Sequence, residues 1–504
     1  MKGAVAAGDK LTALAAAEVL KAGGNAFDGA VAAAFAAPMA EPALTSAGGG
    51  GFLLAISPNS KPVLYDFFVD VPPKRLKEPD FYPITVDFKD AKQVFHIGMG
   101  SVAVPGFVAG LLRVHRERGK LPLKEVLSPA IEYAKRGVKL SPIQASFVKL
   151  LEPIFTATKE ARKVYAPEGK LIDEKRLFKN PDYGEFLELL CREGLWAFYE
   201  GEIADEIDKL SRERGGLIRK EDLERYKVIE RTPLKFSFKG KEVLTNPPPS
   251  SGGVLIAFTL KLLENKELGR WGSVRHLSLV IEALRATSLF RREFIDGELH
   301  KGEASKIIED KEVLSRYLNL LERRLNLWGN TTHVSILDGE GNGVSMTTTN
   351  GEGSGVVIPG TGVMLNNMLG EEDLNPEGFF KWPPYTRLPS MMAPTGILKG
   401  GKVELLLGSA GSNRIRSAIV QVILNYEAFK KGVKEAVELP RVHYEREEVF
   451  AEPGYPEETL KEIRKLYPLT LFSQLSMFFG GVQAVSSEGL GAGDPRRGGC
   501  FIKV

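Results

Sequence analysis

Cysteine is scarce in this chain of 504 residues, which contains only Cys191 and Cys500. Two such thiols cannot form a disulfide framework, and neither lies in a CxxC pair that would indicate a redox centre or a zinc site. We therefore expect both to be inert thiols. Low cysteine content also suits a reducing compartment.

Long apolar runs are also lacking. No stretch approaches the roughly 18 apolar residues needed to cross a bilayer. The start, residues 1–5, leads directly into a helical pattern without the apolar core and cleavage site of a signal peptide. The sequence therefore predicts a cytoplasmic protein without a membrane partner, although a trimmed chain of a secreted protein would look the same.

A charge excess of either sign is missing as well. Lys and Arg number 67 against 64 Asp and Glu, a net charge of +3, and no basic run suggests a polyanion surface. Nucleic acid is therefore not an expected partner. The six histidines are scattered without HExxH spacing, so we expect no metal and no cofactor. The GxSxG elbow of serine hydrolases is absent too.

What the chain does contain is typical of a globular protein, with 43% hydrophobic and 26% charged residues. Its length allows two or three domains or one large layered unit. Apolar periodicity predicts helices over residues 9–22, 28–39, 105–118, 123–136, 184–197, 203–213, 220–226, 254–263, 273–292, 303–326, 413–431 and 456–466.

Strand patterns become frequent after residue 330. One strand is predicted earlier, at residues 52–56, and the others cover residues 344–349, 362–365, 403–407, 469–477 and 482–486. Strands and helices occur in both halves without a regular βαβ rhythm. This favours an α/β sandwich of antiparallel sheets with helices outside over a doubly wound parallel sheet.

A Thr-rich hairpin begins at residue 331. Residues 331–336 alternate between polar and apolar side chains, as in a half-buried strand, and residues 338–343 form a strong turn signal. The returning strand brings Thr349 and Asn350 back beside Thr331. From the pattern alone, a hairpin without chemistry remains the simpler interpretation.

Two other segments have the composition of binding-site walls. The glycines at 48–51 would let a backbone approach a ligand, but they precede a strand and lack the Gly-Lys-Ser/Thr ending of a P-loop. The Pro-rich segment 247–253 is either a linker or, given its short length and apolar flanks, an ordered wall of a site.

Two further segments carry polar groups. The acidic run 371–373 is more simply a solvated face, but beside a pocket it would hold an amine. Residues 408–412 lie between a predicted strand and a helix that starts near 413. Backbone N–H groups there would serve an oxyanion, or the segment is an ordinary turn.

Together these segments resemble the γ-glutamyltransferase family (γ-glutamyl transpeptidases) of N-terminal nucleophile (Ntn) hydrolases over nearly the whole chain. The resemblance is carried by motifs that occur in the family's order, at residues 23–31, 48–52, 104–110, 222–226, 247–253, 331–333, 365–367 and 491–496.

The resemblance implies a four-layer αββα sandwich (α/β class) built from a zymogen that cuts itself between Asn330 and Thr331. The large subunit would be residues 1–330 and the small subunit residues 331–504, intertwined in one catalytic unit. Thr331 would be the nucleophile. Its freed α-amine, with a reference pKa of about 7.7–8.0, would be the base that activates its own hydroxyl.

Other roles carry over by position. Thr349 is similar to the second threonine that hydrogen-bonds the nucleophile, and Asn350 to the asparagine near the substrate amine. Glu371 stands where the family usually has an aspartate. Gly411 matches the first glycine of the Gly-Gly oxyanion pair, whereas the second position is Ser412.

The substrate corner departs from the family. Phe68 replaces the arginine that clamps the substrate α-carboxylate in many members, which removes a charge-assisted bond of about 1.5–3 kcal/mol. Ser390 matches the first of a Ser-Ser pair for the same carboxylate, but Met391 replaces the second. Arg387 and Arg414 are candidates for a replacement charge.

We therefore expect an autoprocessing Ntn amidohydrolase or acyltransferase. Its leading activity would be cleavage of γ-glutamyl amides such as glutathione through a Thr331 ester, with transfer to water or an amine. One alternative is an amidase or acylase for a different acyl group, because Phe68 and Met391 make the carboxylate corner apolar. Another is an unprocessed binding protein without activity. The family also allows a homo-oligomer of the processed heterodimer.

Overall fold

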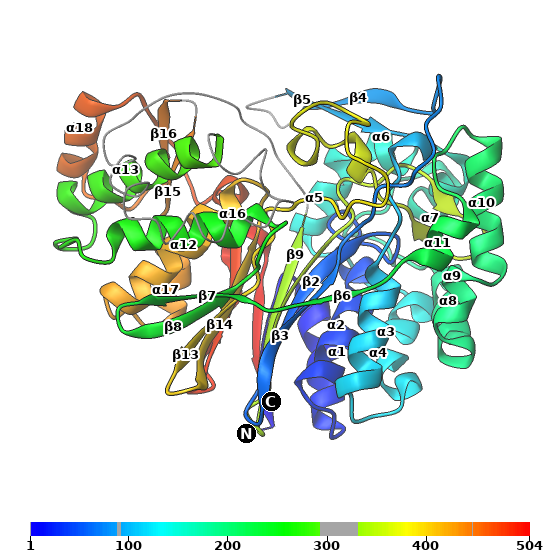
Figure 1. The fold of residues 1–504 in the computed structure, drawn as a ribbon, viewed down its shortest axis with the longest axis horizontal. Coiled ribbons are helices and arrows are strands. Elements are labelled where there is room, and N and C mark those ends of the chain that lie inside the picture. The colour runs from blue at the N-terminus through cyan, green and yellow to red at the C-terminus, as the bar shows by residue number, and fades with distance from the viewer. Residues whose placement is uncertain (1, 88–91, 293–330, 446) are drawn as a thin grey trace.

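Two antiparallel sheets lie face to face between helical layers (Figure 1). The computed structural model describes residues 2–87, 92–292, 331–445 and 447–504, so the helix predicted at 303–326 lies outside the described residues. This arrangement confirms the αββα sandwich expected from the sequence.

The first sheet has seven strands and places the predicted hairpin at its centre. The hairpin strands, β9 and β10, pair antiparallel from Thr332–Thr348 to Leu337–Gly343. The order across the sheet is β20 (Cys500–Lys503), β1 (Gly3–Ala7), β9 (Thr332–Asp338), β10 (Gly343–Thr349), β2 (Gly50–Ser57), β3 (Ser60–Phe67) and β6 (Ile229–Arg231).

The second sheet has six strands. Its order is β19 (Gly491–Ala492), β18 (Gly481–Ser486), β14 (Lys402–Ala410), β13 (Thr395–Lys399), β8 (Lys241–Thr245) and β7 (Leu234–Phe238). Strands from before and after position 330 occur in both sheets, so the two parts of the chain form one core.

Helices cover the outer face of each sheet (Figure 1). Beside the first sheet lie α1 (Lys10–Lys21), α2 (Ala26–Ala40), α3 (Phe107–Arg118), α4 (Leu123–Arg136), α5 (Pro142–Leu150), α6 (Glu152–Phe155), α7 (Lys159–Tyr165), α8 (Pro181–Glu193), α9 (Leu195–Tyr199), α10 (Glu202–Glu213) and α11 (Lys220–Arg225). Beside the second lie α12 (Ser251–Leu263), α13 (Val274–Phe290), α16 (Arg414–Ile423), α17 (Val433–Glu438) and α18 (Glu457–Leu466).

Short strands lie outside the two main sheets. They form three small sheets, made of β4 (Tyr82–Asp87) with β5 (Lys92–Ile97), β11 (Val357–Ile358) with β12 (Val363–Met364), and β15 (Val442–Glu445) with β16 (Glu448–Ala451) and β17 (Leu469–Leu471).

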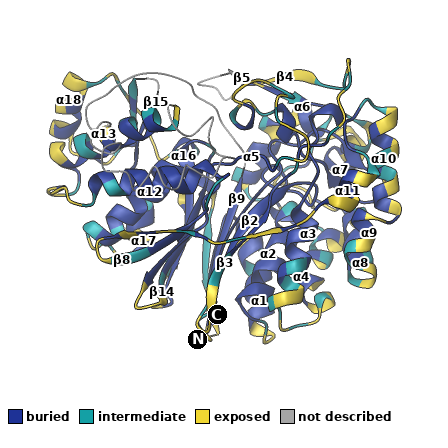
Figure 2. Cartoon of the chain, in the orientation of Figure 1, coloured by how far each residue is buried: buried dark blue, intermediate teal, exposed yellow. Residues whose placement is uncertain are grey.

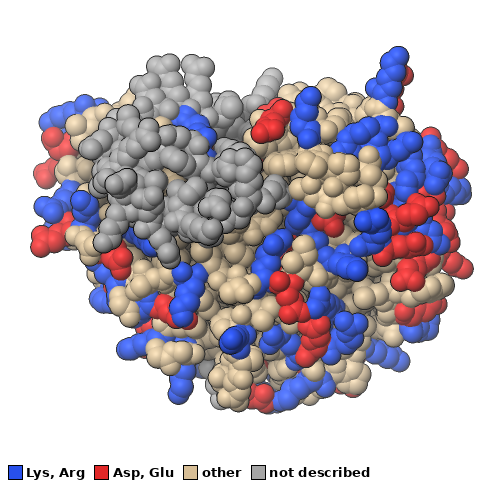
Figure 3. Space-filling model, in the orientation of Figure 1, with Lys and Arg blue, Asp and Glu red and all other residues tan. Residues whose placement is uncertain are grey.

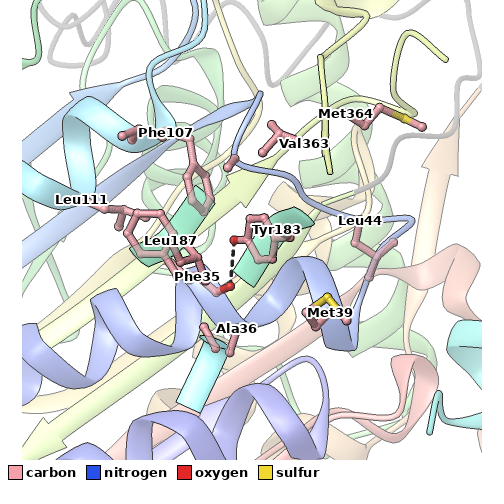
Figure 4. Close-up of a cluster of buried hydrophobic side chains, with 14 of the residues drawn as sticks. Phe35, Ala36, Met39, Leu44, Phe107, Leu111, Tyr183, Leu187, Val363 and Met364 are labelled. Atoms are coloured by element: carbon pink, nitrogen blue, oxygen red, sulfur yellow. Dashed lines mark hydrogen bonds between the residues drawn. The ribbon is translucent and has the colours of Figure 1, made fainter. Parts of the chain in front are cut away.

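The sequence of α2 explains both where this helix begins and how it packs. Asn25 and Asp28 form a capping box that satisfies backbone N–H groups at its start. Its many alanines let it pack closely among the first sheet and the neighbouring helices, so nearly all of it is buried. Phe35 meets Phe107 edge to face, and the Tyr183 hydroxyl donates to the Phe35 carbonyl at 2.9 Å (Figure 4). The core is thereby fixed behind the hairpin.

The expectation of a half-buried hairpin strand is wrong. Every residue of β9 and β10 is buried (Figure 2). One face of this pair packs on α2, and the other packs on β14 and β18 of the second sheet. The polar residues on these strands therefore need partners inside the protein.

Three predicted elements end earlier than expected. The helix predicted at 184–197 divides at Gly194, whose φ of 63° ends α8. The helix predicted at 413–431 leaves α geometry after Ile423, where a π-helical turn covers Leu424–Ala428. Of the strand predicted at 469–477, only Leu469–Leu471 is extended in a sheet.

The surface shows mixed charge. On the face in Figure 3, acidic and basic side chains are interspersed. Among the described helices, none combines the length and apolarity required to cross a membrane.

The glycines at 48–51 have a packing role in the described structure. A Cβ atom at Gly49 would lie 2.1 Å from the Thr349 carbonyl oxygen, and one at Gly51 would lie 2.4 Å from that of Thr347. Only glycine permits these contacts. They bring β2 and its preceding loop against the end of β10, where the predicted site lies.

Candidate active site

Strand alternation directs Thr331 towards the second sheet. Successive side chains on a strand point to opposite faces, so Thr331 shares a face with His333 and Ser335. The Ser335 hydroxyl donates to the Gln483 carbonyl of β18 at 3.1 Å, which identifies this face as the one between the sheets.

His333 fills the space between the sheets as a neutral side chain. Its Nδ1 lies 2.7 Å from the Thr347 hydroxyl and its Nε2 lies 3.0 Å from the Ser335 hydroxyl. Gly408 makes room for the ring, since a Cβ there would lie 2.2 Å from the imidazole. Burial lowers the pKa of His333 to about 3, so the imidazole carries no charge at neutral pH. Its hydrogen bonds stabilise the hairpin beside Thr331.

The opposite face anchors the residue next to Thr331. The Thr332 hydroxyl donates to the buried Glu41 carboxyl at 2.7 Å, and the Thr12 hydroxyl donates to the other oxygen at 2.6 Å. Burial, with a smaller contribution from Asp9, raises the pKa of Glu41 to about 7. Glu41 thus links the start of β9 to α1 and holds a proton over part of the physiological range.

Replacing Glu41 with glutamine should change the pH dependence of stability. The folded protein holds the Glu41 proton up to about pH 7, whereas the unfolded chain releases it near 4.5. This contribution to stability is complete below pH 4.5 and is lost as the pH rises through about 7. At 1.36 kcal/mol per pKa unit the loss is about 3 kcal/mol. In urea unfolding, the free energy of unfolding of Glu41→Gln should therefore rise by about 3 kcal/mol relative to that of the wild type between pH 4.5 and 8. A constant difference would contradict this.

A pocket opens between the ends of the two sheets and contains most of the predicted site residues. It is lined by Phe68, Ser251, Arg291, Thr331, Thr349, Met368, Glu371, Asp373, Leu374, Pro376, Trp382, Pro389, Ser390, Met391, Met392, Ser412 and Ile415. Two predicted residues, Asn350 and Gly411, are neighbours of this lining and not part of it. Asn330 lies outside the described residues.

The predicted carboxylate corner is apolar. Phe68 is 1% exposed and stacks on Phe52 with ring centroids 5.4 Å apart. The Met391 sulfur accepts a hydrogen bond from the Ser251 hydroxyl at 3.0 Å. The Ser251 amide donates to the Ser390 carbonyl at 2.9 Å. Ser251 belongs to the Pro-rich segment 247–253, so this segment contributes a residue to the pocket lining.

Neither arginine suggested as a replacement charge lines the pocket. The Arg387 guanidinium donates to Asp66 and Asp70, each at 2.6 Å, and is almost fully buried. Arg414 lies 3.3 Å from Glu445 and over the Phe478 ring. Both cations are thus engaged inside the protein.

The acidic run reaches the pocket, so its interpretation as a solvated face is wrong for two of three residues. Glu371 and Asp373 line the pocket, whereas Glu372 is exposed. Burial, with the charges of Glu352 and Asp373, raises the pKa of Glu371 well above its usual value. Its Oε1 has no hydrogen-bond partner in the described part of the chain.

Thr349 lies one step beyond the Thr348–Thr332 pair, at the position opposite Thr331. Its hydroxyl accepts from the Gly351 amide at 3.0 Å. Asn350 is buried, and its amide group donates to the Leu365 carbonyl at 3.4 Å. The hairpin thus brings Thr349, but not Asn350, to the wall that contains Thr331.

Several pocket residues were missed by reasoning from the sequence, among them Asp373, Arg291 and Trp382. Asp373 had a signal in the acidic run, but Arg291 and Trp382 had none. Arg291 comes from the end of α13, and its Nη1 donates to the Asn413 side chain at 2.7 Å. Only the folded chain brings these distant segments together.

Comparison with known proteins finds similar chains and a matching family. A model of the family described as gamma-glutamyltranspeptidase matches residues 12–504. The glutathione hydrolase proenzyme of Escherichia coli strain K12 is 29% identical over 498 residues, covering 91% of this chain and 84% of that protein. The acylase ACY 1 proenzyme of Pseudomonas sp. strain SE83 is 32% identical over 475 residues, covering 90% and 85%.

Two solved structures are also similar. Cephalosporin acylase from Bacillus halodurans has a TM-score of 0.88 at 23% identity, covering 99% of this chain and 95% of that one, which supports the fold alone. The gamma-glutamyltranspeptidase of Helicobacter pylori has a TM-score of 0.55 at 29% identity, covering 63% and 91%.

Proposed function

The chain belongs to the gamma-glutamyltranspeptidase family, and from that membership we propose that it is an amidohydrolase that cuts itself before Thr331. In the precursor, the Thr331 hydroxyl attacks the carbonyl carbon of Asn330, and the acyl group moves from nitrogen to oxygen. Water then hydrolyses this ester. The resulting subunits, 1–330 and 331–504, stay together because each contributes strands to both sheets.

Turnover repeats this chemistry on a substrate. The free α-amine of Thr331 accepts the proton of its own hydroxyl, whose oxygen attacks the amide carbonyl. Backbone N–H groups at Gly411 and Ser412 stabilise the oxyanion. The amine product leaves with the proton, and water hydrolyses the Thr331 ester to release the acid. An amine in place of water gives transfer.

We propose an apolar acyl group as the substrate class. The observation that carries this choice is the corner made by Phe68 and Met391, which replaces a cationic clamp in the same pocket as Thr331. Because Arg387 is engaged by Asp66 and Asp70, it does not restore that clamp. Burying a branched or aromatic side chain against such a wall gives about 1.5–3 kcal/mol. The relative that is 32% identical is itself named an acylase.

A γ-glutamyl group is the second candidate, because ionisable side chains also line the pocket. Glu371 has a carboxyl oxygen without a partner in the described chain, which suits a substrate ammonium group. Arg291 also lines the pocket and has the charge that a carboxylate requires.

Three 4-nitroanilides separate the candidates. The 4-methylpentanoyl amide has the shape of the γ-glutamyl amide, with methyl groups in place of its ammonium and carboxylate groups, and the 4-aminobutanoyl amide lacks only the carboxylate. We expect kcat/KM to be about 10–100-fold higher for 4-methylpentanoyl than for γ-glutamyl, which corresponds to about 1.4–3 kcal/mol.

The opposite order would make γ-glutamyl transfer the activity of this chain. A 4-aminobutanoyl amide cleaved better than both others would assign the pocket to an amine without a carboxylate. An uncut chain that hydrolyses none of the three would support the remaining alternative, a binding protein without activity.

A further inference from the structure

Ser412 adopts an unusual backbone conformation at the end of β14. Its φ is +49° and that of the preceding Gly411 is +121°. The left-handed region is sterically unfavourable for a residue with a side chain. Such a conformation persists where surrounding contacts hold it, and it is frequent at functional sites.

A single carboxylate holds this turn. The Ser412 hydroxyl donates to Asp373 Oδ2 at 2.5 Å, and the Asn413 side-chain amide donates to Oδ1 at 3.3 Å. Arg291 in turn donates to the Asn413 side chain at 2.7 Å. Hydrogen bonds to a carboxylate are stronger than those between neutral groups, and they offset the unfavourable backbone conformation of Ser412.

The backbone amides of the turn are available for a ligand. Within the described residues, neither the Gly411 nor the Ser412 N–H has a hydrogen-bond acceptor. Their carbonyl groups, in contrast, accept from the amides of Arg414 and Ile415 at 3.0 Å each. Ser412 and Asp373 also line the pocket together with Thr331.

We propose that Asp373 is a positioning residue that holds the Gly411–Ser412 amides in the orientation required by the oxyanion, acting through the Ser412 hydroxyl. The inference rests on the proposed reaction at Thr331. According to this proposal, Asp373 is required only because residue 412 is a serine. A glycine at 412 adopts a left-handed φ without help, whereas serine requires the carboxylate.

The proposal predicts how Asp373→Ala changes kcat and KM. Removal of one oxyanion donor costs about 10²–10³ in kcat in other hydrolases. Misplacement of a donor that is still present should cost less, so we expect Asp373→Ala to lower kcat about 10–100-fold. Because the amides act on the transition state, KM should change much less than kcat.

A double-mutant cycle on the processed enzyme tests this. The variants are Asp373→Ala, Ser412→Gly and their combination, with Glu372→Ala as the control because Glu372 is adjacent and exposed. Each is assayed with whichever of the three anilides the wild type cleaves best, and kcat and KM are measured separately. Thermal melting confirms that each variant is folded, and the rate of precursor cleavage gives a second measurement.

In the Ser412→Gly background, we expect Asp373→Ala to change kcat by less than threefold. Restored precursor cleavage in the double variant would support the pairing in the same way. An equal loss of kcat in both backgrounds, or no loss in either, would overturn it. If Asp373→Ala unfolds, Asp373→Asn replaces it in the cycle, with the same criterion of rescue by Ser412→Gly. Failure of the proposed function gives a different result from failure of the Asp373 proposal. If the proposed function is wrong, turnover does not depend on Thr331.

Discussion

Replacing Thr331 with alanine is expected to leave the precursor uncut and to lower turnover by roughly a million-fold, the usual cost of removing a nucleophile. The physical reason is that both reactions use the same hydroxyl. Thr331 lines the pocket, whereas the hydroxyl of the adjacent Thr332 is bonded to Glu41 on the opposite face of the sheet. Intact-mass analysis after incubation should show two fragments that meet at 330/331 in the wild type and one chain in the variant.

Thr331→Ser is the matched control, because it retains a hydroxyl and an α-amine after cleavage. It should be processed and should turn over substrate at a reduced rate. Normal cleavage or turnover in Thr331→Ala would remove Thr331 as the nucleophile. A wild-type chain that stays intact would remove the autoprocessing proposal altogether.

Replacing Phe68 with arginine is expected to shift acyl specificity by about 10–100-fold towards γ-glutamyl anilide relative to the 4-methylpentanoyl amide. A guanidinium at this corner would face a substrate carboxylate and contribute about 1.5–3 kcal/mol. It would also remove apolar surface from the pocket. The ratio of the two kcat/KM values is the measurement, because it cancels any loss of active enzyme caused by burying a charge beside Phe52.

Phe68→Leu is the control, because it keeps the corner apolar. Its specificity ratio should remain close to that of the wild type. An unchanged ratio in Phe68→Arg would show that this corner does not contact the acyl group, and the pocket assignment would have to move towards Glu371 and Arg291.

The reaction centre was largely predictable because its signals are local. The strand period, the turn at 338–343 and the returning strand specify that Thr349 comes back to Thr331. In the structure the last pair is Thr348–Thr332, so Thr349 lies at the position opposite Thr331. The capping box of α2 is equally local. The resemblance to Ntn hydrolases rests on short motifs of the same kind. The catalytic roles assigned to Thr331, Thr349, Gly411 and Ser412 remain predictions until the variants are measured.

The surroundings of the centre were not predictable, because they depend on contacts between distant segments. An alternating strand pattern does not reveal that a second sheet covers its polar face, so β9 was expected to be half-buried. The sequence offered Arg387 as a candidate charge, yet the fold pairs it with Asp66 and Asp70. The fold also brings Asp373, which was expected to be solvated, within hydrogen-bond distance of the Ser412 hydroxyl.

By itself, the sequence determined the fold class, the family and the identity of the candidate nucleophile, since each depends on residues close together in the chain. The tertiary structure alone decided which side chains surround Thr331. It brought Phe68, Met391, Glu371, Asp373 and Arg291 into the lining of the same pocket. The physical reason is that burial and ion pairing are long-range properties. A side chain becomes a site residue or a structural one according to which distant partner the fold brings to it.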